Sequence, residues 1–278
     1  MRSLRRPAAV LAALALTASL AGCGTLYQYQ KATEPMSTAV VMPEAQAVAV
    51  DARTDNGRIV IIEDPTVTDT LVSAEAMLIN IDRAERFTIQ TMLDAEGTLV
   101  VRPIWPDGDR LGNERCNVQI TVPTLHDVVA ESSNGSITIK GGKGTSSLNT
   151  SNGSVSVEDR VGDLQVRTSN GRIQIVRASG ELDLRTSNGS VSVAACAPTA
   201  GAPYDWRVST SNGSIRLDLD QPLEASLRAK TSNSTAKVER VSSVGRRTLV
   251  SGRSIQLDGS RGNITLGTSN GSITIRTP

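Results

Sequence analysis

Residues 150–193 decide the fold, because one motif recurs there: residues 150–157 read TSNGSVSV, 168–175 read TSNGRIQI and 186–193 read TSNGSVSV. Further copies are SSNGSITI at 132–139, TSNGSIRL at 210–217, TSNSTAKV at 231–238, VSGRSIQL at 250–257, TSNGSITI at 268–275 and TDNGRIVI at 54–61. Most neighbouring copies between 132 and 275 are 18 residues apart, and the irregular spacings are 24, 21 and 19. A period this regular indicates a repeat architecture.

Within each repeat the residues alternate in the manner of strands. After the Asn-Gly pair, apolar side chains take every second place, as at Val155 and Val157. A short glycine bend then leads into a second alternating segment, as in GDLQV at 162–166 and GELDL at 180–184. A period of two with one apolar face is typical of a half-buried strand. Each unit is therefore a strand, a glycine bend, a second strand and an Asn-Gly corner.

Two architectures fit such a unit. Asn-Gly is the strongest short signal for a β-hairpin, which would give an antiparallel meander. The other is a β-solenoid, in which each 18-residue unit forms one coil stacked in parallel on the one before. We favour the solenoid, because the Asn-Gly corner and the glycine bend alternate strictly along the chain, and an antiparallel meander gives no reason for two alternating kinds of turn. The expected fold is all-β: a right-handed, single-stranded β-helix with a rise of about 4.8 Å per coil and a length of roughly 40 Å.

The Asn-Gly corners should then lie above one another. Their Thr, Ser and Asn side chains can hydrogen-bond along the stack as ladders, and we expect Gly171 to have a positive φ. An array of ligand contacts is the alternative interpretation of this row. The corners lack the aspartates of calcium-binding β-rolls, so we predict no metal there. The corner residues are Asn56, Gly57, Asn134, Gly135, Asn152, Gly153, Asn170, Gly171, Asn188, Gly189, Asn212, Gly213, Asn270 and Gly271.

The composition excludes several classes of protein. The 278 residues include 29 basic and 28 acidic side chains, six aromatic residues and a single histidine, His126. A nucleic-acid partner is excluded by the missing basic excess and the scarcity of rings. One histidine cannot build a histidine-based zinc site, and its neighbours resemble no hydrolase motif. So few rings predict a narrow aliphatic core without aromatic side chains, and we expect no cofactor.

The N-terminus reads as a targeting segment. Three arginines precede an apolar run over residues 8–20, which ends in Leu-Ala-Gly-Cys at 20–23. This end resembles the bacterial lipobox, so residues 1–22 are expected to be a signal peptide and Cys23 a lipidated N-terminus. The alternative is an ordinary secretory signal. Residues 23–46 contain two prolines and no period, which predicts a flexible tether. The expected location is a membrane outside the cytoplasm, periplasmic or at the cell surface.

Residues 47–123 are less regular than the repeats at 124–278. We interpret them as a β-rich N-terminal cap on the solenoid, with one possible helix at 82–93. The chain ends directly after the last repeat, so no C-terminal cap is expected. The first copy of the motif, at 54–61, lies within the cap as an outlier.

Two loops depart from the repeat, at 103–116 and 194–207. They carry Cys116 and Cys196, an even pair in an oxidising compartment, for which a disulfide and two free thiols are both open. They also carry Trp105, Tyr204 and Trp206. These rings form either a recognition patch or caps over exposed strand edges, and capping is the interpretation we favour.

The S/T-N-G-S/R-I/V-x-I/V units, the G-x-L-x-L segments and the VQITVP entry at 118–123 resemble a bacterial "putative adhesin" family, a domain of unknown function with β-strand repeats. The resemblance covers about residues 46–276. It implies a right-handed β-helix-like fold at the cell surface or in the periplasm, and no catalytic residues.

The expected function is therefore that of a non-catalytic, lipid-anchored envelope protein that binds or adheres, with the membrane, envelope proteins or surface polysaccharide as partners. An accessory or sensor of an envelope-stress system is the alternative. An enzyme acting on polysaccharides is a weaker one, because the outward acids at Asp163, Glu181, Asp183, Asp218 and Asp220 form no clustered pair.

Overall fold

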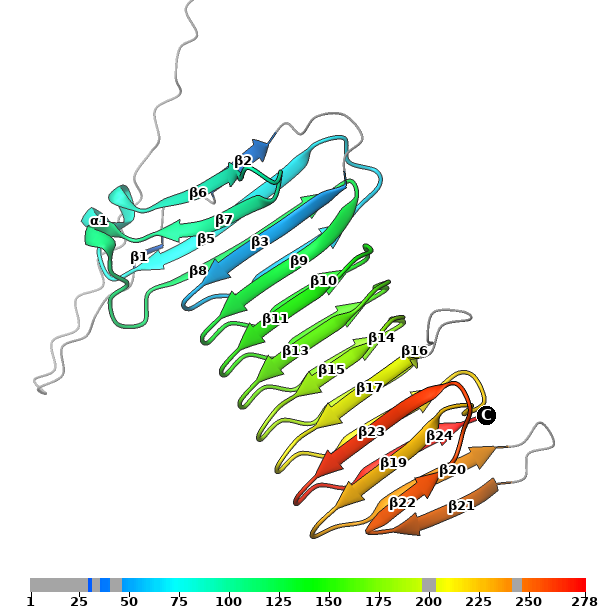
Figure 1. Ribbon diagram of the computed structural model, residues 1–278. Coiled ribbons are helices and arrows are strands. Elements are labelled where there is room, and N and C mark those ends of the chain that lie inside the picture. Colours follow the sequence, from blue (N-terminus) through cyan, green and yellow to red (C-terminus); the bar gives the residue numbers. More distant parts are fainter. Residues whose placement is uncertain (1–29, 32–35, 41–46, 197–203, 242–246) are drawn as a thin grey trace, which may run out of the picture.

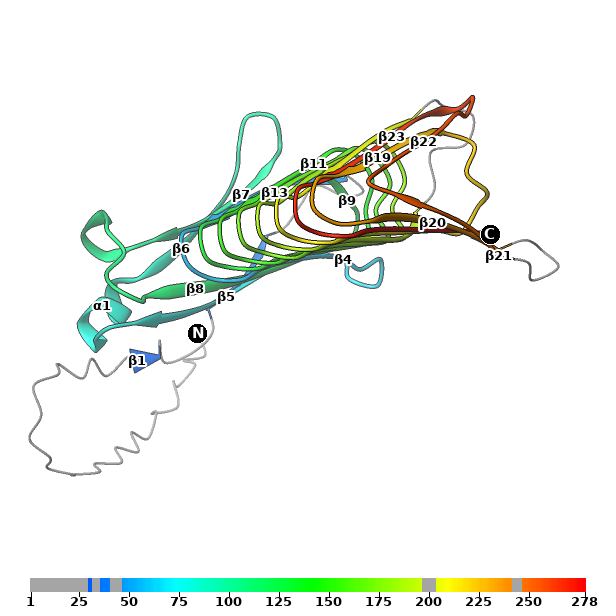
Figure 2. The same ribbon diagram turned by 90° about the horizontal axis from the view of Figure 1, so that it is seen from below.

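The computed structural model describes residues 30–31, 36–40, 47–196, 204–241 and 247–278. These residues form two long sheets that lie face to face (Figure 1), and the core between them is mainly aliphatic. Seen from below, the coils overlay as flattened loops with one sheet on each side (Figure 2). The all-β solenoid expected from the repeat is confirmed.

Sheet A contains, in spatial order, β1 (Gln30–Lys31), β5 (Thr70–Leu78), β8 (Arg115–Val122), β4 (Ile59–Glu63), β10 (Ile137–Lys140), β12 (Val155–Glu158), β14 (Ile173–Val176), β16 (Val191–Cys196), β18 (Ile215–Leu219), β24 (Ile273–Thr277), β20 (Ala236–Val241) and β21 (Arg247–Gly252), with β2 (Met36–Val40) paired to β5. Sheet B contains β22 (Ser254–Leu257), β19 (Ser226–Thr231), β23 (Gly262–Thr268), β17 (Tyr204–Ser209), β15 (Leu182–Arg185), β13 (Leu164–Thr168), β11 (Ser146–Thr150), β9 (Leu125–Ser132), β3 (Val48–Thr54), β7 (Leu99–Ile104) and β6 (Thr88–Leu93).

The central coils are in parallel register with an offset of one repeat. Val155 of β12 pairs with Ile137 in the preceding coil and with Ile173 in the following coil, each 18 residues away. On the opposite sheet, Leu164 pairs with Leu182 in the same way. Identical positions therefore stack, and the apolar ones form continuous buried columns, which is how short strands that could not form a core alone share one.

The order of the coils differs from the order of the sequence at both ends. The motif copy at 54–61 forms a regular coil, because β4 pairs with both β8 and β10. The final repeat does not end the stack: β24 lies between β18 and β20, and β23 lies between β17 and β19. Residues 48–63 thus belong to the solenoid, whereas the sequence had placed them in its cap.

Antiparallel strands close both ends (Figure 1). At the N-terminal end, β5 pairs antiparallel with β8 and β6 with β7, beside helix α1 (Ile81–Arg86) and a 3-10 turn at Pro106–Gly108. At the other end, β21 pairs antiparallel with β20 and β22 with β19. The expectation of an uncapped C-terminal end is wrong, because β21 and β22 pair antiparallel with the last parallel coil. No pattern in the sequence indicates this change of direction.

Two further expectations need correction. The helix expected at 82–93 ends at Arg86, and Thr88–Leu93 is strand β6, whose T-I-Q-T-M-L pattern alternates in the manner of an edge strand. The expected tether contains β2, which pairs with β5 through Met36 to Val40. Residues 1–29, with the expected signal peptide and Cys23, lie outside the described residues. In the part of the chain that the structure describes, no helix is long and apolar enough to cross a membrane.

Candidate binding surfaces

Each Asn-Gly corner is held by a buried hydroxyl. In the coil of β13, Thr168 Oγ1 accepts a hydrogen bond from Gly171 N at 3.1 Å and donates one to the carbonyl of Gly153 in the preceding coil, also at 3.1 Å. Ser132 makes the equivalent pair of hydrogen bonds in its own coil. The hydroxyl thus satisfies two main-chain groups that the sharp corner removes from the strand ladders. The buried hydroxyl residues of this column are Thr54, Ser132, Thr150, Thr168, Thr186, Thr210, Thr231 and Thr268.

Outside the same corner, the asparagines form an exposed ladder. The side-chain amide nitrogen of each asparagine donates to the side-chain oxygen of the asparagine one coil nearer the N-terminal end, at 2.6–2.7 Å. In spatial order the ladder runs through Asn134, Asn152, Asn170, Asn188, Asn212, Asn270 and Asn233. Each of these amides is engaged with its neighbours, which makes the row a structural element of the corner.

The corner glycines are required for a reason other than the one expected. Gly171 does not have a φ in the left-handed region; a Cβ placed on it would lie 1.7 Å from the carbonyl oxygen of Gly153. Close approach of stacked backbones therefore demands glycine here. Among the Asn-Gly corners Gly57 is the exception, with a φ of 153°, whereas positive φ recurs at the opposite corner, for example 124° at Gly162 and 117° at Gly180.

The two tryptophans do not form a recognition patch. Trp105 is 6% exposed, packs against Phe87 with ring centroids 5.0 Å apart, and donates its indole N–H to Asp55 Oδ2 at 3.0 Å. Trp206 is 1% exposed and donates to the carbonyl of Gly180 at 2.9 Å. The core thus accepts a ring where the indole N–H finds a partner. The side chain of Tyr204 lies outside what the structure describes.

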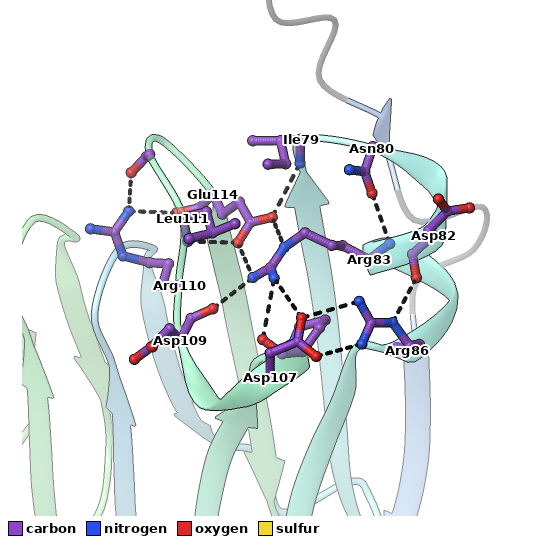
Figure 3. A network of polar contacts seen from close by, with 12 residues as sticks. Ile79, Asn80, Asp82, Arg83, Arg86, Asp107, Asp109, Arg110, Leu111 and Glu114 are labelled. Atoms are coloured by element: carbon purple, nitrogen blue, oxygen red, sulfur yellow. Dashed lines mark hydrogen bonds and ion pairs between the residues drawn. The ribbon is translucent and has the colours of Figure 1, made fainter.

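The loop that carries Trp105 is fixed by a buried ion pair that the sequence did not reveal (Figure 3). Arg83 of α1 binds both carboxylate oxygens of Glu114, at 2.7 and 2.9 Å, and also binds the carbonyls of Pro106 and Asp109. Burial opposes the charged form of Glu114, but hydrogen bonds from Arg83, Leu111 and Ile79 lower its pKa. The charged pair is fully hydrogen-bonded, as burial requires.

Cys116 and Cys196 are not brought together. Both are buried free thiols in sheet A, and β8 and β16 are separated there by β4, β10, β12 and β14. Five strand spacings amount to about 24 Å, far beyond the reach of a disulfide. Burial raises the pKa of Cys116 to about 12 and also raises that of Cys196.

A second buried cation, Arg160, lies inside the glycine-bend corner. Its side chain is 0% exposed and donates to Ser146 Oγ at 2.9 Å and to the carbonyls of His126, Thr145 and Gly141. Burial lowers the pKa of Arg160 to about 10, against the attraction of Asp127 and Glu63. In the sequence Arg160 is one of several charged residues that flank the strands, so no pattern predicts that its side chain is buried.

The outer face of sheet B carries a row of carboxylates around a hollow of about 340 Å³. Four carboxylates of this hollow already have intramolecular partners: Asp127 binds Thr145, Asp163 accepts from Glu181 N, Asp183 pairs with Arg185 and Asp205 with Arg207. Hydrogen bonds to Thr145 and His126 lower the pKa of Asp127 although its partial burial opposes this. Within the described ranges, no three His, Cys, Asp or Glu side chains are grouped to hold a metal ion.

The outer face of sheet A has a hollow of different character, about 390 Å³ in volume, over β14, β16 and β18. Ser190, Ser192 and Ser214 line it together with the longer side chains of Arg172, Gln174 and Arg216. No carboxylate lines it. Small hydroxyl groups between long side chains explain why a flat sheet face is hollow at this point.

The family described as Toastrack DUF4097 matches residues 38–276. The chain belongs to this family. The match extends over both sheets and both antiparallel ends of the Toastrack domain, and the resemblance to a domain family of unknown function is confirmed. No curated protein matches the sequence.

Several solved structures are similar to the Toastrack domain at low sequence identity. One, titled a "putative adhesin" from Bacteroides fragilis NCTC 9343, is 12% identical, with 87% of this chain and 97% of that chain covered and a TM-score of 0.43. A "putative lipid binding protein" from Parabacteroides distasonis ATCC 8503 is 11% identical, with 88% and 97% covered and a TM-score of 0.36. A "putative cell adhesion protein" from Clostridium sporogenes ATCC 15579 is 10% identical, with 88% and 100% covered and a TM-score of 0.31.

Proposed function

We propose that this protein is a lipid-anchored, non-catalytic component of the cell envelope whose Toastrack domain binds an envelope protein or a surface polysaccharide. The observation that carries the proposal is the distribution of side chains in the solenoid. Aliphatic residues and both indoles point inward, and two polar sheet faces with hollows remain open along the stack. Such a rod offers a long contact surface held in fixed register.

The lipid anchor rests on the lipobox ending at Cys23. Several acyl chains on one residue hold a protein durably on a bilayer, since each buried CH₂ adds about 0.8 kcal/mol. The test is cell fractionation of the full chain and its Cys23→Ser variant, with Cys196→Ser as the matched control. Cys23→Ser should move the protein out of the membrane fraction and Cys196→Ser should not. Retention of Cys23→Ser in the membrane fraction would contradict the anchor.

Binding is tested in living cells with a photo-crosslinking amino acid at one outer-face position of each sheet, the half-buried Ser192 on sheet A and the exposed Gln165 on sheet B. Glu96, in the turn between β6 and β7, is the control position. A discrete adduct from a sheet position and none from the control supports the proposal. No adduct from either face, together with unchanged surface attachment of a deletion strain, would contradict it. Release of reducing ends from envelope polysaccharides by the purified protein would instead show an enzyme.

A further inference from the structure

The hollow on sheet A contains a cation that the fold does not use, Arg172. Several exposed arginines pair with a neighbouring acid: Arg177 with Glu158 and Asp159, and Arg276 with Glu239. Arg172 forms no ion pair with any described residue, unlike Arg177 and Arg216. Its guanidinium therefore keeps its donors free at the margin of the hollow.

Arg216, on the other side of the hollow, is only partly engaged. Its Nε donates to Asp218 Oδ2 at 2.7 Å, which leaves the terminal nitrogens outside this contact. In register, Gln174, Ser192 and Arg216 occupy one column of three successive strands, and Arg172, Ser190 and Ser214 precede them by two residues on the same face. Two strand spacings, about 10 Å, thus separate the coils of the two arginines.

The lining matches one kind of ligand. Two guanidinium groups recognise anionic groups with directional hydrogen bonds, and the serine hydroxyls and the Gln174 amide between them can both donate and accept. No ring lines the hollow on which a base could stack, which disfavours a nucleic acid. Beyond the hollow, the column of Gln174 continues along the same sheet through Ser156 and Thr138, so an extended chain can lie across several coils.

We propose that this hollow is a binding site for an extended acidic polysaccharide, with Arg172 and Arg216 contacting carboxylate groups on separate sugar residues and the serines and Gln174 contacting hydroxyls between them. This inference rests on the proposed function and specifies its ligand and its face. Sheet B serves as the contrast, since its hollow is lined by five carboxylates and a single arginine, an excess of negative charge that would repel such a chain.

The test uses the full chain purified in detergent, with immobilised polygalacturonate and alginate as probes, neutral dextran as the uncharged control and polyphosphate as the non-sugar polyanion. Arg172→Gln and Arg216→Gln should each weaken uronate binding roughly fivefold, since exposed charge contacts contribute modestly. The double variant should weaken it roughly 25-fold, and dextran should bind at least as weakly. Raised salt should weaken the wild type more than the double variant.

The matched control is Arg228→Gln, which removes one exposed arginine from β19 on the opposite sheet. It should leave binding within twofold of the wild type. Equal weakening by Arg228→Gln, unchanged binding by the double variant, or a preference for polyphosphate would overturn the site. If uronates do not bind but Ser192 or Gln165 still crosslinks in cells, only this inference fails; if neither occurs, the proposed function fails with it.

Discussion

The buried corner hydroxyls offer the sharpest test of how the solenoid is held together, and Thr168→Val is the decisive change. Valine keeps the shape of threonine and replaces only the hydroxyl with a methyl group. The substitution therefore removes the acceptor of Gly171 N and the donor to the carbonyl of Gly153, both at 3.1 Å, without opening a cavity.

The size of the effect follows from those two groups. A buried main-chain group that loses its partner costs about 1–3 kcal/mol. Thr168 is 8% exposed, so water has little access, and the two groups together should cost about 2–4 kcal/mol. For a chain of this length that corresponds to a fall in melting temperature of roughly 5–15 °C.

The measurement is denaturant unfolding followed by circular dichroism, together with a thermal melt. Thr168→Ser is the control, because Ser132 makes the same two hydrogen bonds in another coil. Serine loses one methyl group, so its cost should be about 1 kcal/mol. If Thr168→Val unfolds at the wild-type midpoint, or if Thr168→Ser is as damaging as Thr168→Val, the hydroxyl does not stabilise the corner and the reasoning is wrong.

Three other perturbations test separate parts of the structure. Gly171→Ala should destabilise by at least about 2 kcal/mol, since its Cβ meets a backbone carbonyl, whereas Gly267→Ala, with nothing within 4 Å, should change stability by less than about 0.5 kcal/mol; similar melts for the two would refute the close-approach argument. Folding lowers the pKa of Glu114 below its usual 4.5, so the stability that the ionised carboxylate contributes is present above that pH and is lost as the pH falls. Glu114→Gln should therefore be less stable than the wild type at pH 7, and its melting temperature should fall less steeply between pH 7 and pH 3. A melting temperature that depends on pH as in the wild type would count against a stabilising role of the Glu114 charge. Cys116 and Cys196 should resist a thiol reagent in the native protein and both react after unfolding, and recovery of a disulfide-linked peptide pair by mass spectrometry would contradict the separation of their strands.

The repeat could be translated into a fold because its period specifies both the coil and its contents. An 18-residue offset places Val155, Ile137 and Ile173 in one column, as the register shows. The same offset places the asparagines above one another, from which a ladder follows. What the sequence cannot supply is the reason for Gly171, because the distance between stacked backbones is a property of the assembled coil.

The two tryptophans differ in how far the sequence predicts their burial. Trp206 and Val208 alternate with Arg207 in the way that Leu182 and Leu184 alternate with Asp183, and they are their register partners. The period of two therefore pointed Trp206 inward. Trp105 offers no such signal, because its burial depends on Phe87 and Asp55, which are distant in sequence.

The buried ion pair of Arg83 and Glu114 could not be predicted from the sequence for a related reason. Arg83 and Glu114 are 31 residues apart and belong to a helix and a loop that follow no repeat, so neither spacing nor pattern joins them. Their contact arises only when α1 and the loop after the Pro106–Gly108 turn are packed at the same end of the stack (Figure 3).

The spatial order of the coils could not be predicted from the sequence, and this order determines which strands form the end of the solenoid. The copies at 210–217 and 268–275 are nearly identical in sequence, so the sequence of one copy does not determine which coil stacks next to it. In the structure Ile273 pairs with both Ile215 and Ala236, which places the last copy between the two earlier ones. Inserting β23 and β24 inside the stack leaves the hairpin strands β21 and β22 to form its end. A free parallel coil would present two open edges suited to another copy of the same coil. Antiparallel strands at both ends change that hydrogen-bonding pattern, which disfavours continued parallel stacking of one copy on another.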